Sequence, residues 1–228
     1  MAVTMSFVSQ KGGVGKSTLA RSVAVEAAKA GVDVVIADLD IQQGTIQEWA
    51  KLRYANGIEP TIRVKTCRTA DDALLIGSTV DLLLIDGPAR ASAGTLVLAQ
   101  QSDLIVQPTG VSLDDLRPAV VLFHELVNHG IPADRLVMAL VRTGSEAQEV
   151  AARTYIEKAG YGVLDGAIAD KPAYCDSLNR GEGLTETRHR QLAEKAAEVV
   201  AALLVRLKKK VEQRRKLETG KTKKRVAT

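Results

Sequence analysis

The chain has 228 residues, of which 46% are hydrophobic and 25% are charged, and its net charge is +4. These values are typical of a globular protein with one domain, or one domain and an extension. No apolar run approaches the length of a bilayer-spanning helix, and the N-terminus lacks the features of a secretory signal. Cys67 and Cys175 lie far apart and outside any metal-ligand spacing, so we expect reduced thiols in a cytoplasmic protein.

Strand-like and helix-like segments alternate along the chain. In chain order, the sequence predicts a strand (2–9), a helix (16–30), a strand (32–38), a helix (45–55), a strand (61–67), a short helix (69–77), a strand (80–87), a helix (93–100), a strand (102–109), a helix (116–127), a strand (135–143), a helix (145–160), a strand (162–168) and a long last helix from about 189. This alternation favours an α/β fold with a doubly wound, mostly parallel sheet and helices on both faces. We expect this domain over 1–205 and a basic extension over 206–228. Ligands of such sheets bind beyond the carboxyl ends of the strands.

The segment SQKGGVGKST, residues 9–18, lies between the first predicted strand and the first predicted helix. Its glycines allow backbone N–H groups to turn toward phosphate oxygens, and the helix N-terminus adds partial positive charge. Lys16 suits the β- and γ-phosphates of a nucleotide, and the hydroxyl of Ser17 suits Mg²⁺. The segment therefore predicts a nucleotide-binding loop. Its predicted binding residues are Lys11, Gly12, Gly13, Val14, Gly15, Lys16, Ser17 and Thr18.

Two details set this loop apart from the general phosphate loop: its first glycine position is not glycine, and a second lysine, Lys11, precedes the glycines. KGGVGKST resembles the deviant Walker A box of the ParA/MinD superfamily of P-loop ATPases. The resemblance implies a P-loop NTPase fold, ATP and Mg²⁺ as cofactors, and an ATP-bound homodimer. It also implies that Lys11 is catalytic and reaches the nucleotide of the other monomer, where a cation supplied in trans neutralises charge on the transferring phosphoryl group.

Acidic residues follow the second predicted strand. The family pattern there is D-x-D-P-Q; this chain has Asp38 and Asp40, has Ile41 in place of the proline, and keeps Gln42. The resemblance implies that Asp38 holds Mg²⁺ through water and that Asp40 is catalytic, orienting or deprotonating the attacking water.

A third carboxylate, Asp86, ends the apolar run of DLLLIDGPA. This pattern is typical of a Walker B strand, which brings one carboxylate to the magnesium. The predicted metal ligands are therefore Ser17, Asp38 and Asp86. Gly87 and Pro88 follow in a tight turn, which suits a segment that responds to loss of the γ-phosphate.

Adenine recognition in the family falls to loops after the last strands. The corresponding segments here, 142–145 and 169–176, suggest Arg142 and Pro172 as nucleotide-binding residues, with a purely structural role as the alternative. Trp49 resembles a tryptophan of the small ParF-like branch, but we favour a helix residue that packs on the sheet.

The chain is strongly basic at its end: the residues from Arg206 onward carry eleven Lys or Arg and two Glu, a net charge of +9, whereas the remainder carries −5. An apolar stripe continues the last helix into this segment as far as Val211. Dense basic charge without aromatic residues favours non-specific DNA binding through phosphates. A membrane-surface helix and a solvated tail are the alternatives. The predicted DNA-binding residues are Arg206, Lys208, Lys209, Lys210, Arg214, Arg215 and Lys216.

Together these features predict a ParA-like partition ATPase that resembles the small ParF-like branch. The sequence starts almost at the first strand, so we expect no operator-binding helix-turn-helix and a separate ParB-like centromere-binding or cargo-adaptor partner. The resemblance implies slow intrinsic hydrolysis, ATP-driven dimerisation and binding to nucleoid DNA, for segregation of a plasmid, chromosome or other cargo. The alternatives are a MinD-like membrane-cycling ATPase and a metabolic P-loop ligase.

Overall fold

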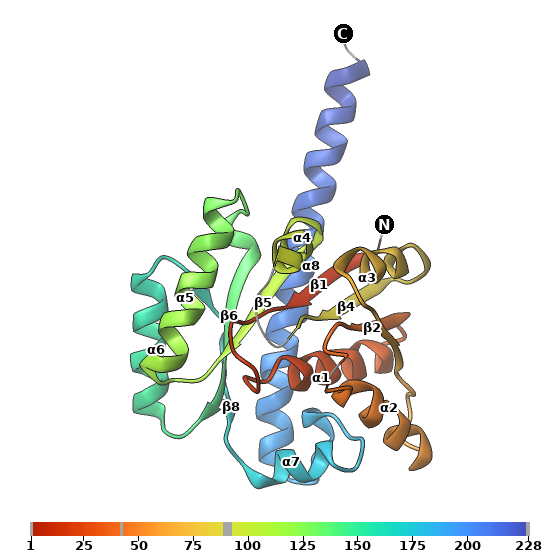
Figure 1. The fold of residues 1–228 in the computed structure, drawn as a ribbon, viewed down its shortest axis with the longest axis vertical. Helices are drawn as coiled ribbons and strands as arrows, with labels where there is room; N and C mark the ends of the chain where they lie inside the picture. The colour runs from red at the N-terminus through yellow and green to blue at the C-terminus, as the bar shows by residue number, and fades with distance from the viewer. Residues whose placement is uncertain (1, 42, 89–92, 227–228) are drawn as a thin grey trace.

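The computed structural model describes residues 2–226, apart from 42 and 89–92, and describes side chains as far as residue 216. A parallel sheet with the order β3-β2-β4-β1-β5-β6-β7 forms its centre, and β8 pairs with β6 (Figure 1). The strands are β1 (Val3–Phe7), β2 (Val34–Asp38), β3 (Arg63–Thr66), β4 (Leu82–Asp86), β5 (Leu104–Thr109), β6 (Leu136–Thr143), β7 (Gly162–Val163) and β8 (Ile168–Ala169).

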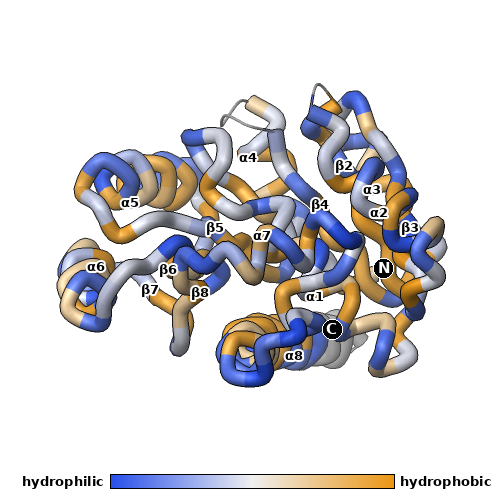
Figure 2. The backbone as a smooth tube through the Cα atoms, turned by 90° about the horizontal axis from the view of Figure 1, so that it is seen from below, coloured by the Kyte–Doolittle hydropathy of each residue, from blue (hydrophilic) through white to orange (hydrophobic). Residues whose placement is uncertain are grey.

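Helices cover both faces of this sheet, which confirms the predicted doubly wound α/β fold. The helices are α1 (Lys16–Lys29), α2 (Thr45–Ala55), α3 (Ala70–Ile76), α4 (Ala93–Gln101), α5 (Leu113–Asn128), α6 (Glu146–Lys158), α7 (Pro172–Leu178) and α8 (Arg190–Val226), with 3₁₀ turns η1 (Gly77–Thr79), η2 (Ala133–Arg135) and η3 (Leu184–Glu186). Figure 2 looks along α5, α6 and α8, each of which carries both hydrophobic and hydrophilic residues around its axis.

The core is aliphatic and lies on both faces of the sheet. On one face α1, α2 and α8 pack on side chains such as Phe7 and Ile36. On the other face α5 and α6 pack on Ile105 and Met138, while α3 and part of α4 pack on Leu83. Successive strand residues point to opposite faces, so strands buried on both sides need continuous apolar runs, and these are the runs that the sequence displays.

The strand register fixes the position of two predicted metal ligands. Asp38, the last residue of β2, lies directly opposite Asp86, the last residue of the adjacent β4. Phe7, the last residue of β1, is the partner of Asp86 on the other side. Because the three strands are parallel, their carboxyl ends meet at one edge of the sheet, where α1 also begins.

Helix α8 continues through the predicted boundary at residue 205 without a break. Leu207 and Val211 are buried in the core region, and the side chain of Arg214 forms a 2.7 Å ion pair with Asp103, which precedes β5. Lys210 pairs with Asp134 near the start of β6. The first two turns of the predicted extension therefore pack on the domain, and the end of the helix projects beyond it (Figure 1).

The sequence prediction was wrong for the region 162–172. A single strand was predicted over 162–168, but the structure has two strands of two residues, β7 and β8, with Gly166 between them at φ +74°. The short helix α7, which begins at Pro172, was not predicted. Proline suits the first helical position because it has no N–H to leave unpaired there. Within the part of the chain that the structure describes, no helix combines the length and apolarity needed to cross a bilayer.

Candidate nucleotide-binding site

The phosphate loop turns between β1 and α1 with two glycines in the left-handed region, Gly13 at φ +70° and Gly15 at φ +95°. Residues with a side chain rarely adopt these backbone angles, which explains why both positions are glycine. Gly15 is the N-cap of α1 and has no side chain to cap the helix. A Cβ on Gly15 would lie 3.4 Å from Val141 of β6, so the loop passes close to the sheet. The first N–H groups of α1 are thus left available for an anion.

Lys16 is held in the interior of this loop. Its Nζ donates a 2.9 Å hydrogen bond to Oγ of Ser9, and Oγ of Ser9 donates to the backbone oxygen of Lys11. Burial lowers the pKa of Lys16, and the charges of Asp86 and Asp40 oppose that shift. When a nucleotide enters the cavity, this ammonium group can exchange its hydrogen bond to Ser9 for charge-assisted hydrogen bonds to phosphate oxygens.

The predicted magnesium ligands converge at the carboxyl ends of β2 and β4. Oγ of Ser17 donates a 2.6 Å hydrogen bond to Oδ2 of Asp86, whereas Oδ1 of Asp86 is buried without a hydrogen-bond partner among the described residues. Burial raises the pKa of Asp86 to about 7 and also raises the pKa of Asp38. Oδ1 of Asp38 accepts a 2.9 Å hydrogen bond from the backbone N–H of Asp40.

These residues fit a magnesium ion. A buried carboxylate with one unpaired oxygen is poorly stabilised without a nearby cation. The described residues contain no group of three or more His, Cys, Asp or Glu side chains that would hold a metal by themselves. Mg²⁺ in nucleotide sites is held by one or two carboxylates together with water and the phosphates. Asp86 and Asp38 would provide the carboxylates and Ser17 a hydroxyl, which leaves the remaining positions to water and phosphate.

A cavity of about 370 Å³ opens beside the loop. Its wall includes Lys16, Ser17 and Asp40 from the phosphate end, and Arg142 from the end of β6. Arg142 is exposed and has φ +53°, the left-handed value that is uncommon outside glycine. Gln42 lies outside the described residues.

The opposite wall of the cavity comes from α7 and the residues before it. Lys171, Tyr174 and Cys175 line the cavity, and the predicted Pro172 is the first residue of the same helix. The hydroxyl of Tyr174 donates a 2.8 Å hydrogen bond to the backbone oxygen of Leu192 on α8. Lys171 and Tyr174 were not predicted. A seven-residue helix gives too short a periodicity to find, and only the proline marks its start.

Lys11 does not line the cavity that Lys16 lines. Its Nζ lies 3.1 Å from Oδ1 of Asp115 on α5, and the two side chains are 42% and 20% exposed. Oδ2 of the same carboxylate accepts a hydrogen bond from Oγ of Ser112. Burial raises the pKa of Asp115, but the bonds from Lys11 and Ser112 outweigh it and hold the pKa below its usual value.

Trp49 is buried on α2 and belongs to the core on the α1 side of the sheet, in line with the packing role that we favoured. Its Nε1 donates a 3.0 Å hydrogen bond to the backbone oxygen of Glu182. The guanidinium groups of Arg21 and Arg53 lie 5.6 and 5.7 Å from its ring. Arg21 also lines the cavity and was missed from the sequence.

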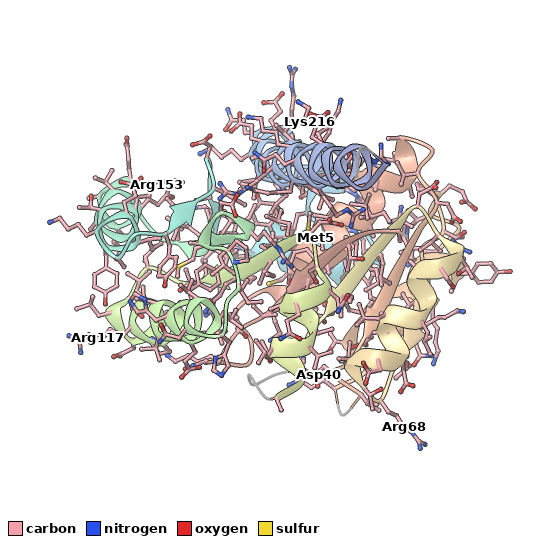
Figure 3. The ribbon with its side chains drawn as sticks, turned by 90° about the horizontal axis from the view of Figure 1, so that it is seen from above. Met5, Asp40, Arg68, Arg117, Arg153 and Lys216 are labelled. Atoms are coloured by element: carbon pink, nitrogen blue, oxygen red, sulfur yellow. The ribbon has the colours of Figure 1, made fainter. Side chains whose placement is uncertain are left out.

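The basic residues of α8 differ in their surroundings. Arg206, Lys210 and Arg214 are partly buried against the domain, whereas Lys208 and Lys209 are exposed. Arg215 and Lys216 are exposed as well. The contacts of this segment are with residues at the amino ends of β5 and β6, so it lies at the edge of the sheet opposite the phosphate loop. In Figure 3, Lys216 and Asp40 lie on opposite sides of the molecule.

Solved structures confirm the fold. MinD, a cell division ATPase of Pyrococcus furiosus, is 16% identical with a TM-score of 0.71, over 89% of this chain and 98% of that one. MinD of Pyrococcus horikoshii, complexed with Mg-ADP, is 16% identical with a TM-score of 0.70, over 88% and 95%. A ParA family ATPase from Chlorobium tepidum is 18% identical with a TM-score of 0.69, over 89% and 99%.

No curated protein matches the sequence. The family described as the CobQ/CobB/MinD/ParA nucleotide binding domain matches residues 5–218, which include the loop, the carboxylates and most of α8. The chain therefore belongs to the CobQ/CobB/MinD/ParA nucleotide-binding family, as the resemblance of its phosphate loop to the ParA/MinD superfamily predicted.

Proposed function

We propose that this chain is a ParA-like positioning ATPase that dimerises with ATP and Mg²⁺, binds DNA non-specifically, and hydrolyses ATP slowly until a partner protein stimulates it. One observation carries the proposal: the loop holds Lys16 inside the cavity beside Ser17 and Asp86, whereas its second lysine, Lys11, lies outside that cavity. A phosphate site with one internal and one external lysine suits a nucleotide shared between two copies.

Each residue has a distinct role in the proposed reaction. Lys16 and the N–H groups at the start of α1 bind the phosphates. Ser17, Asp86 and Asp38 would hold Mg²⁺, which would supply positive charge to neutralise the phosphates. Asp40 either orients the attacking water or accepts a proton from it. Asp40 lies on the cavity wall, where such a water would have access. For recognition of the adenine of the nucleotide, we propose Arg142 and the residues of α7 from Pro172 onward.

The position of Lys11 supports dimerisation. Lys11 has to leave Asp115 to reach a triphosphate, and it lies outside the cavity that Lys16 lines. We therefore propose that the triphosphate it reaches is bound by a second copy. Leu113, in the same first turn of α5 as Asp115, is 49% exposed, so an apolar side chain close to the Lys11–Asp115 pair is available for a contact with a second copy.

DNA binding is proposed for the exposed basic residues of α8 at the opposite edge of the sheet, with a ParB-like or cargo-adaptor partner completing the cycle on nucleoid DNA. Two copies in an ATP dimer would engage DNA together, so DNA affinity would rise with dimerisation. The second candidate is a membrane-cycling positioning ATPase. Structures of a ParA family ATPase and of MinD are both similar to this chain in fold, so the choice between the two candidates depends on the test below.

The nucleotide part of the proposal is tested with a non-hydrolysable ATP analogue and Mg²⁺. The wild type should bind the analogue and sediment as a dimer, Lys16→Gln should lose binding, and Lys11→Ala should bind but remain monomeric. Asp40→Ala should form a stable dimer with ATP itself. Lys29→Gln, on the exposed end of α1, is the matched control. A Lys11→Ala protein that dimerises normally contradicts the role in trans.

The DNA part is tested by co-sedimentation of the analogue-bound dimer with DNA and with anionic liposomes. The double substitution Lys208→Gln and Lys209→Gln should weaken DNA binding. It should also reduce the slope of log K against log [salt] by about 2 for each monomer, or about 4 for the dimer. Lys195→Gln, exposed at the other end of α8, is the control. Binding to liposomes and not to DNA would favour the membrane-cycling candidate.

A further inference from the structure

Arg21 is a buried cation in the candidate site that no part of the phosphate-loop pattern requires. It lies on α1 one helical turn beyond Ser17, is 5% exposed, and lines the cavity. Its Nε and Nη2 have no hydrogen-bond partner among the described residues. A buried polar group without a partner is costly, and a buried guanidinium more so, which indicates that the group has a use in another state of the site.

Two features offset part of this cost. The guanidinium lies 5.6 Å from the centre of the Trp49 ring, a cation–π contact. Burial lowers the pKa of Arg21 to about 10, and the negative charges of Asp86 and Asp38 oppose that shift. Neither feature provides an acceptor for the two unpaired donors. The contact with Trp49 therefore suits the position of the Arg21 guanidinium before a nucleotide binds.

The missing acceptor is present in the same site. Oδ1 of Asp86 is buried and unpaired, while Oδ2 is already occupied by Ser17. Ser17 and Arg21 are four residues apart on α1, so their side chains lie on the same face of the helix. An unpaired carboxylate oxygen and an unpaired guanidinium within electrostatic range are complementary, through direct contact or through one buried water.

The charge of the loaded site also favours this arrangement. Asp38, Asp40 and Asp86 bring three negative charges to a site that would receive a triphosphate, and Lys16 and Mg²⁺ together supply three positive ones. Arg21 supplies one more cation without occupying a magnesium coordination position. Its planar fork suits a carboxylate better than a point charge does.

We propose that Arg21 is a positioning residue of the magnesium site: when Mg²⁺ and nucleotide bind, its guanidinium donates to the free oxygen of Asp86 and fixes that carboxylate for the metal. This inference rests on the proposed nucleotide function. Because the guanidinium moves relative to Trp49 in this step, the environment of the indole changes as well.

The test compares Arg21→Met, Arg21→Lys and the control Lys29→Met, which removes a charge of the same sign from an exposed position on α1. Binding of a non-hydrolysable ATP analogue is measured with Mg²⁺ and with EDTA. Arg21→Met should weaken Mg²⁺-dependent binding about tenfold, the usual effect of losing a hydrogen bond to a charged group. Its binding in EDTA should stay within about twofold of the wild type. Lys29→Met should match the wild type in both conditions.

Trp49 provides a second readout, because it is the one tryptophan of the chain. Adding Mg²⁺ to the nucleotide complex should change its emission in the wild type and in Lys29→Met, but not in Arg21→Met. Arg21→Lys keeps the charge and loses the fork, so it should show a smaller loss of Mg²⁺-dependent binding. It also serves as the test variant if Arg21→Met does not fold.

Two results would overturn the inference. Equal losses with Mg²⁺ and with EDTA would mean that Arg21 contacts the nucleotide itself. Unchanged binding in every Arg21 variant would leave it as a cation that merely packs on Trp49. A wild-type protein that binds no nucleotide would instead contradict the proposed function, so the two failures are distinguishable.

Discussion

Asp115→Ala should strengthen the ATP-dependent dimer. In the structure the carboxylate of Asp115 holds Nζ of Lys11 at 3.1 Å within the same chain. The proposed use of Lys11 at the nucleotide of a second copy requires that ion pair to break. Removing Asp115 therefore removes a cost of dimerisation, while it leaves Lys11 and the phosphate loop unchanged.

The size of the effect follows from exposure. The two side chains are 42% and 20% exposed, so the pair is a partly screened surface ion pair worth about 0.2 to 1 kcal/mol. A dimer breaks two such pairs, which amounts to about 0.4 to 2 kcal/mol. At about 1.4 kcal/mol per tenfold, the dimer dissociation constant should fall about twofold to thirtyfold.

Sedimentation equilibrium with Mg²⁺ and a non-hydrolysable ATP analogue measures this constant. Asp114→Ala is the matched control, because Asp114 is an exposed carboxylate in the same first turn of α5 and has the same favourable interaction with the helix N-terminus. An Asp115→Ala protein that dimerises no more tightly than Asp114→Ala would refute this prediction. Recovery of dimerisation when Asp115→Ala is added to Lys11→Ala would refute it as well, because Asp115 would then act without Lys11.

Three further predictions concern the fold and the cavity. Glu186→Ala should destabilise the protein by about 3 to 5 kcal/mol, because it leaves the buried Arg53 without its carboxylate, which Arg53 contacts at 2.6 and 3.0 Å. Burial raises the pKa of Glu186, but hydrogen bonds from Arg53 and from the N–H of Gly183 outweigh burial and hold the pKa below 4.5. The stabilisation from Glu186 is therefore present above pH 4.5 and is lost as the pH falls through the pKa of Glu186 in the folded protein. The denaturation curves of the wild type and Glu186→Ala should converge in acid. Leu207→Ala should lower the free energy of unfolding in urea by about 2 to 5 kcal/mol, and Val205→Ala, at an exposed position, should lower it by under about 0.5 kcal/mol. Equal effects of the two substitutions would make the segment after residue 205 a separate extension. Cys175, exposed on the cavity wall, should react with a thiol reagent quickly and should be protected by nucleotide, whereas the buried Cys67 should react slowly in both cases; labelling of Cys175 at the same rate in the presence of nucleotide would remove α7 from the binding wall.

The sequence predicted the sheet and the phosphate end of the site because both depend on local patterns. Continuous apolar runs mark strands that are covered on both faces, and the aspartates at their ends then meet at one edge of a parallel sheet. The register of β2 and β4, which sets Asp38 opposite Asp86, follows from that arrangement.

Features that depend on contacts between distant segments were not predicted. The pairing of Lys11 with Asp115 joins residues 104 positions apart, and nothing in either segment reports it. Arg21 has the sequence context of an ordinary amphipathic helix residue, and its contact with the ring of Trp49 joins α1 to α2. The anchoring of Arg214 by Asp103, which precedes β5, likewise joins distant segments, so the sequence predicted that the last helix continues but not that its basic segment is held against the domain.

The length of α8 gives the molecule a mechanical link between its two ends. Leu192, near the start of the helix, accepts the hydrogen bond from Tyr174 on the cavity wall, and Arg214 is anchored at the opposite edge of the sheet. At 1.5 Å per residue these points are about 33 Å apart on a single stiff rod. We therefore expect a displacement of the cavity wall at Tyr174 to be transmitted along α8 toward its basic end.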